Sequence, residues 1–253
     1  MKTISGNAYT KLCAGYPTLL SVPSSAISAN LTWLKLLALA AMLFDHMVVG
    51  YLQTHGESVT NSFLRLPGRL SIPIFSFLIA YSYAHYTSNK NRQLVRLWLF
   101  AAISEPIYRA YFGEFGNALI ALALGVTFLL MQEKMCGLYR RLSLLAFFCV
   151  AALAFALVTK SILMLTIPAL VWLFYLYGKN KNAVWLIPIV AMGTLSNHIG
   201  WGELAMLSIT LGLILLLSNI DVKLPPVHLN KWVGYVFYPL HLLVLYTVKC
   251  FFF

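Results

Sequence analysis

Charge is scarce in this sequence, and negative charge is the scarcest. Only 10% of the 253 residues are charged, whereas a soluble domain carries about 25%. Seven residues are acidic against 18 basic, and hydrophobic residues make up 60% of the chain. The mean hydropathy is +0.80. A water-soluble globule does not bury this much apolar sequence, so we predict that a lipid bilayer surrounds most of the chain.

Recognisable catalytic and metal-binding motifs are also absent. The sequence contains no HExxH, P-loop, GxSxG or EF-hand pattern. Its four cysteines show neither a CxxC pair nor another metal-ligand spacing, so we expect free thiols and no metal. They are Cys13, Cys136, Cys149 and Cys250.

Long apolar runs take the place of such motifs. The net charge of +11 does not indicate nucleic-acid binding, because the basic residues stand singly or in pairs between these runs. Runs of about 18 apolar residues predict spanning helices, whereas a transmembrane barrel has alternating segments of ~10 residues. We therefore predict an all-α, polytopic transmembrane bundle of about nine helices. The expected spans are 31–52, 70–86, 94–112, 117–131, 142–158, 162–177, 183–195, 204–218 and 232–252.

The predicted bundle forms one domain, residues 31–253, after an N-terminal arm of residues 1–30. The apolar stretch in the arm is short and is broken by Pro17 and Pro23, which argues against a signal peptide. We expect a loosely ordered cytoplasmic arm. The seventh span is about 20 Å long by helical rise, so it is either re-entrant or tilted. We find no internal repeat.

Basic residues concentrate in alternate loops. The positive-inside rule places these loops and the N-terminus in the cytoplasm, and the C-terminus then faces outward. The richly basic loops contain Lys90, Arg92, Arg96, Lys134, Arg140, Arg141, Lys179, Lys181, Lys223 and Lys231.

Asp45 and His46 are the least expected polar residues, because they lie inside the otherwise apolar first span. A charge near the middle of a bilayer costs about 2.5–3.5 kcal/mol on insertion scales and therefore needs a partner. Neighbouring helical residues point about 100° apart, so we expect each side chain to find its partner on another helix. The alternative to a functional role is a hydrogen bond that holds helices together.

A second group of polar residues surrounds the break at Pro67 and Gly68. Arg69 lies at the mouth of the second span, on the same side of the membrane as His46, and Arg65 precedes it. A guanidinium there pairs with Asp45, or it binds a phosphate or carbonyl oxygen. The alternative is an arginine that extends to the membrane interface.

The last span adds Tyr238, Pro239 and His241, and Pro239 predicts a kink. His241 is either a packing histidine or part of a site. Weaker candidates lie near helix ends, and these are Arg96, Glu105 and Asn117.

These positions together resemble the TraX family. The similar segments are LKLLA at 34–38, MLFDH at 42–46, LPGRLSIPIFSF at 66–77, RL at 96–97, GN at 116–117 and FYPLHL at 237–242. The resemblance covers roughly residues 31–248. No single segment is diagnostic, but the ordered set is fairly specific.

The resemblance implies a membrane-bound acyltransferase of the bacterial inner membrane. Members of the family are known as F-pilin acetylases of conjugative plasmids. The implied donor is acetyl-CoA, and the implied acceptor is the N-terminal amine of a mature pilin subunit, which signal peptidase exposes on the outer face. Acetyl-CoA is cytosolic, so its pantetheine arm has to thread the bundle, or an enzyme intermediate has to carry the acetyl group.

The implied catalytic residues are His46, Asp45 and Arg69. His46 suits a general base, because an α-amine with a pKa near 7.7–8.0 must lose a proton before it attacks. Asp45 tunes the site, and Arg69 stabilises the oxyanion or a CoA phosphate. Alternatively, His46 itself carries the acetyl group as a covalent intermediate. The implied substrate-binding residues are Arg65, Arg96, Asn117, Tyr238 and His241.

Other functions stay open at this point. A transporter also buries Asp, His and Arg, although many transporters are built from repeated halves. A pilus-assembly factor needs no catalytic histidine, and another envelope glycan or peptide is an alternative acceptor.

The predicted orientation is testable with reporter fusions. Alkaline phosphatase fused at His55, Glu114 or His198 should be active, because each of these loops is expected outside, and a fusion at Lys134 should be inactive. Cytoplasmic readings at His55, Glu114 and His198 would place His46 on the wrong side of the membrane for a pilin acceptor.

Overall fold

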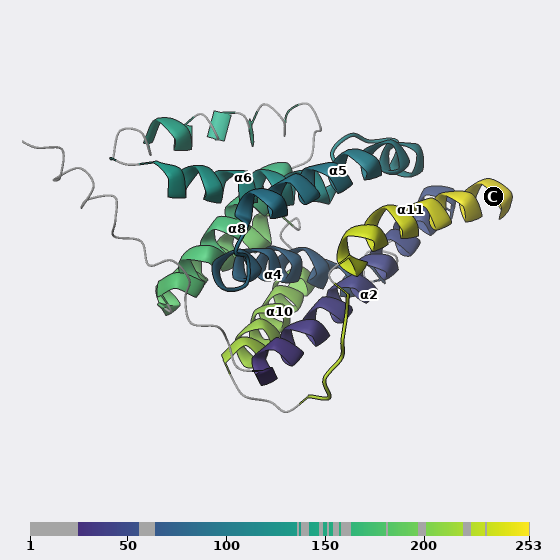
Figure 1. Ribbon diagram of the computed structural model, residues 1–253. Helices are drawn as coiled ribbons and strands as arrows, with labels where there is room; N and C mark the ends of the chain where they lie inside the picture. Colours follow the sequence, from purple (N-terminus) through teal and green to yellow (C-terminus); the bar gives the residue numbers. More distant parts are fainter. Residues whose placement is uncertain are drawn as a thin grey trace, which may run out of the picture.

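The computed structural model describes residues 25–55, 64–135, 137, 142–146, 149–150, 152–153, 157, 163–180, 182–196, 201–219, 224–230 and 232–252. Every element in these ranges is a helix (Figure 1). The elements are α2 (Ser25–His55), η1 (Pro67–Leu70), α4 (Ser71–His85), α5 (Lys90–Phe112), α6 (Ala118–Lys134), α8 (Leu163–Asn180), η2 (Ala183–Trp185), α9 (Leu186–Ser196), α10 (Trp201–Asn219) and α11 (Val233–Phe252).

These helices match the predicted spans closely, with two exceptions. Helix α2 begins at Ser25 rather than at Leu31, so the end of the predicted arm is helical, and residues 1–24 lie outside the described ranges. The predicted span 142–158 is described only in part, as residues 142–146, 149–150, 152–153 and 157. The all-α class is confirmed.

Two helices of the described chain are long and apolar enough to cross a membrane. They are Ile27–Gly50 within α2 and Val233–Phe251 within α11. The apolar helices Ala183–Thr194 and Leu204–Asn219 are shorter. The predicted count of about nine spans therefore stays a prediction.

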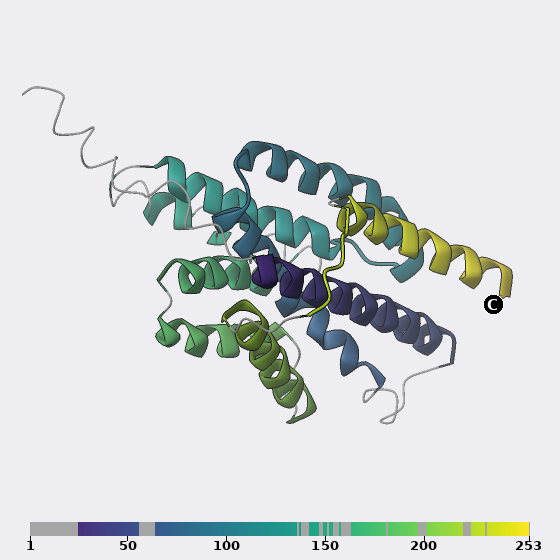
Figure 2. The same cartoon turned by 60° about the horizontal axis from the view of Figure 1, so that its bottom comes forward.

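Helix α2 is central to the packing, because it contacts η1, α4, α10 and α11. Figure 2 shows it crossing the middle of the bundle, and α11 runs beside it (Figures 1 and 2). Helix α5 packs on α6 and α11, while α8 packs on α4 and α6. The first and last helices are thus neighbours in space.

Local signals explain where α5 and α6 begin and end. The side chain of Asn89 accepts a hydrogen bond from the Arg92 amide and caps α5. Gly113 ends this helix at a φ of 78°, a conformation that suits glycine. Asn117 caps α6 in the same way as Asn89, through the Ile120 amide.

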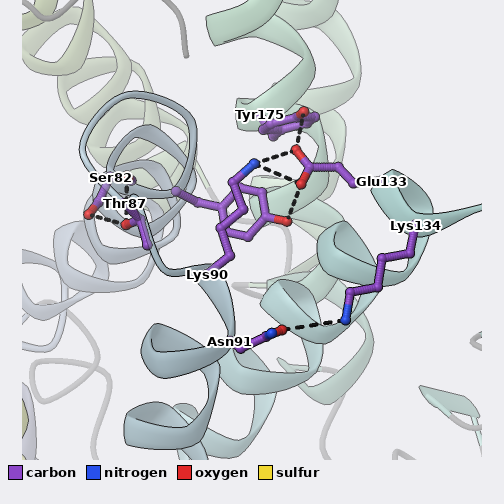
Figure 3. Close-up of polar contacts among 8 residues, drawn as sticks. Ser82, Thr87, Lys90, Asn91, Glu133, Lys134 and Tyr175 are labelled. Carbon is purple, nitrogen blue, oxygen red and sulfur yellow. Dashed lines mark hydrogen bonds and ion pairs between the residues drawn. The ribbon is translucent and has the colours of Figure 1, made fainter. Parts of the chain in front are cut away.

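A polar cluster around Glu133 ties four helices together. Lys90 Nζ lies 2.7 Å from both Glu133 carboxylate oxygens, and the hydroxyls of Tyr83 and Tyr175 donate to them at 2.9 and 3.1 Å. Figure 3 shows Lys90 and Tyr175 converging on this carboxylate. All four groups are satisfied by one another, so we assign the cluster a structural role that joins α4, α5, α6 and α8.

The structural role of this cluster predicts a loss of stability on substitution. Glu133→Leu removes the carboxylate that the Lys90 ammonium and two tyrosine hydroxyls contact, so the free energy of unfolding should fall by about 1–3 kcal/mol. The exposed neighbour Lys134 makes one 3.5 Å contact to Asn91. Lys134→Ala should therefore change the free energy of unfolding by about 0.5 kcal/mol or less. Thermal unfolding in detergent measures both. Equal effects would contradict the structural role.

Candidate functional site

Two histidines from opposite ends of the sequence meet between α2 and α11. His46 Nδ1 lies 2.7 Å from His241 Nε2. Their rings are stacked, with centroids 4.9 Å apart and planes 14° apart. His241 is buried and His46 is half-buried. The sequence identifies each histidine as unusual, but only the structure brings them together.

The hydrogen bonds of this pair assign its protons. His241 Nδ1 lies 2.8 Å from the Phe237 carbonyl oxygen, which can only accept, so Nδ1 carries the proton. In the neutral ring, Nε2 of His241 is then an acceptor, and His46 Nδ1 must donate to it. His46 Nε2 is left with a lone pair. No described residue forms a hydrogen bond to that nitrogen, so it is available as a base or nucleophile.

Aromatic side chains enclose the pair and hold the two rings in place. Phe112 meets His46 edge to face at 5.1 Å between centroids, and Tyr238 lies 6.2 Å from the same ring. Phe237 stacks on His241 at 5.0 Å. These contacts restrict rotation of both imidazoles, which keeps the hydrogen-bonded geometry.

Backbone contacts also position the His46 turn of α2. The Tyr111 hydroxyl donates to the His46 carbonyl at 2.9 Å. It reaches that far because Gly50 has no side chain: a Cβ there would lie 1.9 Å from the hydroxyl oxygen. Lys249 in turn donates to the Tyr111 carbonyl at 3.2 Å. The turn of α2 that carries His46 is therefore tied to α5 and, through Lys249, to α11.

Asp45 has its partner outside α2, as its neighbour His46 does. Arg65 Nε lies 3.4 Å from the Asp45 Oδ1 atom. The sequence offers Arg69 as a partner for Asp45, but the ion pair that the structure records is with Arg65. Gly68 packs directly on Asp45, because a Cβ at this position would lie 2.3 Å from Asp45 Cβ.

Asn117 and Glu105 support the site rather than line it. The Glu105 carboxylate accepts from the Gly116 and Asn117 amides and from Asn117 Nδ2, at 2.9, 3.1 and 2.7 Å. Asn117 Oδ1 accepts from the Ile120 amide. The Ala118 amide donates to the Tyr238 hydroxyl at 3.3 Å. This network fixes Tyr238 beside the histidines and leaves Asn117 fully bonded, so the predicted substrate contact at Asn117 gains no support.

Arg96 is not brought to the histidine pair. Its guanidinium lies over the Trp232 ring at 5.0 Å. Along α5 it is about 24 Å from Phe112, which contacts His46. Any role of Arg96 therefore belongs to the far end of the bundle.

A cavity of about 530 Å³ lies beside α2, and its lining includes neither the two histidines nor Arg96. On α2 it is lined by Ser28, Leu31, Lys35 and Met42, which lie on one face of the helix, and His46 follows one turn after Met42 on that face. The end nearest His46 is lined by Met42, Ala118 and Tyr238. The remaining lining residues are Thr32, Phe75, Leu78, Ile79, Tyr81, Ser82, Tyr86, Gln93, Leu97, Leu119, Leu122, Leu229, Gly234 and Tyr235.

Lys35 is the one charged residue in this lining, and the sequence did not mark it as a site residue. Its side chain lies against Gly234, where a Cβ would be 3.0 Å from Nζ. No described residue offers Lys35 a hydrogen bond or an ion pair. The signal in the sequence is its spacing from His46, because eleven residues are close to three helical turns and place both on one face.

Metal chemistry has no visible site in the described ranges. No three His, Cys, Asp or Glu side chains gather there in a way that could hold a metal ion. Cys149 and Cys250 are exposed free thiols.

Comparison with known proteins places the chain in a family. A family model described as TraX protein matches residues 30–249. The chain belongs to the TraX family. The matched range contains both histidines, Asp45, Arg65 and Lys35.

A relative of this TraX chain is the probable fimbrial assembly protein FimC, serogroup H1, of Dichelobacter nodosus. It is 24% identical over 243 residues, which cover 86% of this chain and 95% of the relative. No solved structure matches the chain at a significant level. The name of this relative refers to fimbrial assembly.

The packing of Gly68 on Asp45 predicts a matched pair of glycine substitutions. Gly68→Ala forces a methyl group into the Asp45 side chain and should lower the free energy of unfolding by about 1–3 kcal/mol, as overpacking does. Gly212 on α10 has no atom within 4 Å of its Cβ position, so Gly212→Ala should be neutral or slightly stabilising. Thermal unfolding in detergent compares the two, and equal stability of both variants would show that the η1 contact is loose.

Proposed function

We propose that this protein is a membrane-bound acetyltransferase of the inner membrane, which moves an acetyl group from acetyl-CoA to the N-terminal amine of a pilin subunit. The observation that carries the proposal is the lone pair on His46 Nε2, on an imidazole that a hydrogen bond to His241 orients, one helical turn beyond the Met42 end of the cavity. Such an arrangement can supply a base close to a substrate bound in the cavity.

The shape of the cavity suits the donor. Its lining follows α2 from Ser28 to Met42, a length of about 21 Å by helical rise, and is mostly apolar. A pantetheine arm is a narrow, flexible chain that fits such a space with its thioester towards His46. This supports direct threading of the arm through the bundle.

The proposed reaction is general-base catalysis of acyl transfer. The amine nitrogen of the acceptor attacks the thioester carbonyl carbon, the C–N bond forms, and the C–S bond breaks. His46 Nε2 takes the proton from the attacking amine and returns it to the leaving sulfur, so free CoA thiol is released. The positive charge that forms on His46 is shared through Nδ1 with His241, which itself donates to the Phe237 carbonyl. His241 therefore acts as a positioning residue, much as the acidic member of a triad orients its histidine.

His46 also supports a covalent route. In that route Nε2 attacks the thioester carbonyl carbon, the C–S bond breaks, and CoA leaves as a thiolate. The amine nitrogen then attacks the acetyl carbonyl carbon, the bond from that carbon to His46 Nε2 breaks, and the amine proton passes to the thiolate. Brief incubation with radiolabelled acetyl-CoA followed by a denaturing quench near neutral pH distinguishes the two routes, because only the covalent one leaves acetyl-histidine on the protein.

The proposed orientation in the membrane follows from the direction of the cavity along α2, from Ser28 to Met42. We place about nine spans in the inner membrane, with the N-terminus and the Ser28 end of the cavity towards the cytoplasm. The His46 end then faces the side on which signal peptidase exposes the pilin amine. Acetyl-CoA and pilin would thus approach the histidines from opposite sides.

A second candidate function is a non-enzymatic factor in pilus assembly. The name of the Dichelobacter nodosus relative favours it, since that protein is called a probable fimbrial assembly protein. Such a factor has no use for a free lone pair on His46 and would tolerate its removal.

Substitution of the two histidines separates these functions. His46→Gln should lower pilin N-acetylation by about 10²–10⁴-fold, because the base is lost. His241→Ala should lower it less, since His46 keeps its nitrogen but loses its orientation. Mass spectrometry of the pilin N-terminus, with and without this gene, gives the acetylated fraction, and the exposed His228→Ala variant serves as the control.

Two outcomes would refute the enzymatic function. One is pilin that carries no acetyl group in the presence of the unsubstituted protein. The other is His46→Gln protein that acetylates pilin at the normal rate. Loss of pilus assembly without any change in acetylation would support the assembly factor instead.

A further inference from the structure

Gln93 has a buried oxygen for which the described part of the chain supplies no partner. The residue lies in the first turn of α5 and is 8% exposed. Its Oε1 atom accepts no hydrogen bond from any described residue, although Gln93 lines the cavity. A buried amide oxygen without a partner costs about 1–3 kcal/mol, so its presence in a cavity points to a ligand that donates a hydrogen bond.

Neighbouring polar groups at this end of the cavity are already engaged. The Thr32 hydroxyl donates to the Ser28 carbonyl, and the Ser82 hydroxyl lies 3.5 Å from that of Thr87. The Gln93 Oε1 atom and the Lys35 ammonium have no such partner among the described residues, and they lie on two different helices, α5 and α2. A ligand that satisfies both must offer an N–H or O–H donor to Gln93 and an acceptor or negative charge to Lys35.

Distances along α2 indicate which part of the donor lies here. Lys35 precedes His46 by about 16 Å of helical rise, which is comparable with the reach of an extended pantetheine arm from thioester to phosphate. Gln93 is further from the histidines: it lies about 28 Å along α5 from Phe112, which contacts His46. If the acetyl group is at His46 and a phosphate is at Lys35, Gln93 therefore lies next to the nucleotide.

The surroundings of Gln93 suit a nucleobase. Tyr81, Tyr86 and Tyr235 line the cavity with it and offer rings on which a base can stack. A glutamine amide is complementary to adenine, since its oxygen accepts from the 6-amino group and its NH₂ donates to N7. The terminal torsion of glutamine is soft, so a small rotation presents the oxygen to the cavity.

We propose that Gln93 recognises the adenine of the acyl donor through its exocyclic amino group, with Lys35 at the phosphates. This inference rests on the proposed use of acetyl-CoA and adds to it a specificity-determining residue. Gln93 then contributes to binding of the acyl donor and not to catalysis. Substitution of Gln93 should therefore raise the KM for acetyl-CoA and leave kcat nearly unchanged.

Direct binding to the purified full-length protein in detergent provides the test. The probes are CoA, its hypoxanthine analogue, which lacks the 6-amino group, and 4′-phosphopantetheine, which lacks the nucleoside. Gln93→Leu should weaken CoA binding about tenfold, which is the expected effect of one lost hydrogen bond to a base. It should leave 4′-phosphopantetheine unaffected. The unsubstituted protein should bind the hypoxanthine analogue about tenfold more weakly than CoA, and Gln93→Leu should bind both nucleotides equally.

Exposed Asn91, on the same turn of α5, supplies the control, and Asn91→Ala should bind all three probes normally. Equal weakening of CoA and 4′-phosphopantetheine by Gln93→Leu would overturn the inference, because the residue would then serve the arm or the fold. Normal CoA binding by Gln93→Leu would also overturn the inference, because water rather than the ligand would then be the partner of Gln93 Oε1. Failure of the unsubstituted protein to bind CoA at all would overturn both this inference and the proposed function.

Discussion

The hydrogen bond between His46 and His241 is the interaction around which the site is arranged. It joins the first and last helices of the described chain, and its direction follows from the Phe237 carbonyl, which accepts only. Much of the nearby structure serves to keep this geometry. Tyr111 holds the His46 turn through Gly50, while the Glu105 and Asn117 network holds Tyr238 against the same ring.

Scarcity of charge makes the polar side chains informative. In an apolar bundle a polar group without a partner is unfavourable, so most of them are paired. Glu133 and Glu105 are satisfied within the fold and need no substrate to explain them. His46 Nε2, Gln93 Oε1 and the Lys35 ammonium lack such partners in the described chain. Gln93 and Lys35 line one cavity, and His46 lies one helical turn beyond Met42, which lines the same cavity.

Helix α2 carries two of these groups and fixes the distance between them. Its cavity face presents Lys35 and His46 close to three turns apart, so the separation of the two groups is set by the helical rise rather than by loop geometry. A rigid spacing of this kind suits a substrate with a fixed distance between its charged end and its reactive end. The arrangement lies within the range that the TraX family model matches.

The helical class and the approximate positions of the helices were readable from the sequence, because runs of apolar residues and their polar breaks are local properties. The same holds for Asp45, His46 and His241, which are conspicuous in apolar surroundings. The sequence did not show which side chains pair with one another. Asp45 forms its ion pair with Arg65 although the sequence offered Arg69, and Asn117 caps a helix. Lys35 and Gln93 were overlooked because each looks like an ordinary residue near the end of a span. Contacts between residues as far apart as 46 and 241 depend on how the helices pack, and only the folded chain decides which side chains are satisfied and which remain free for a substrate.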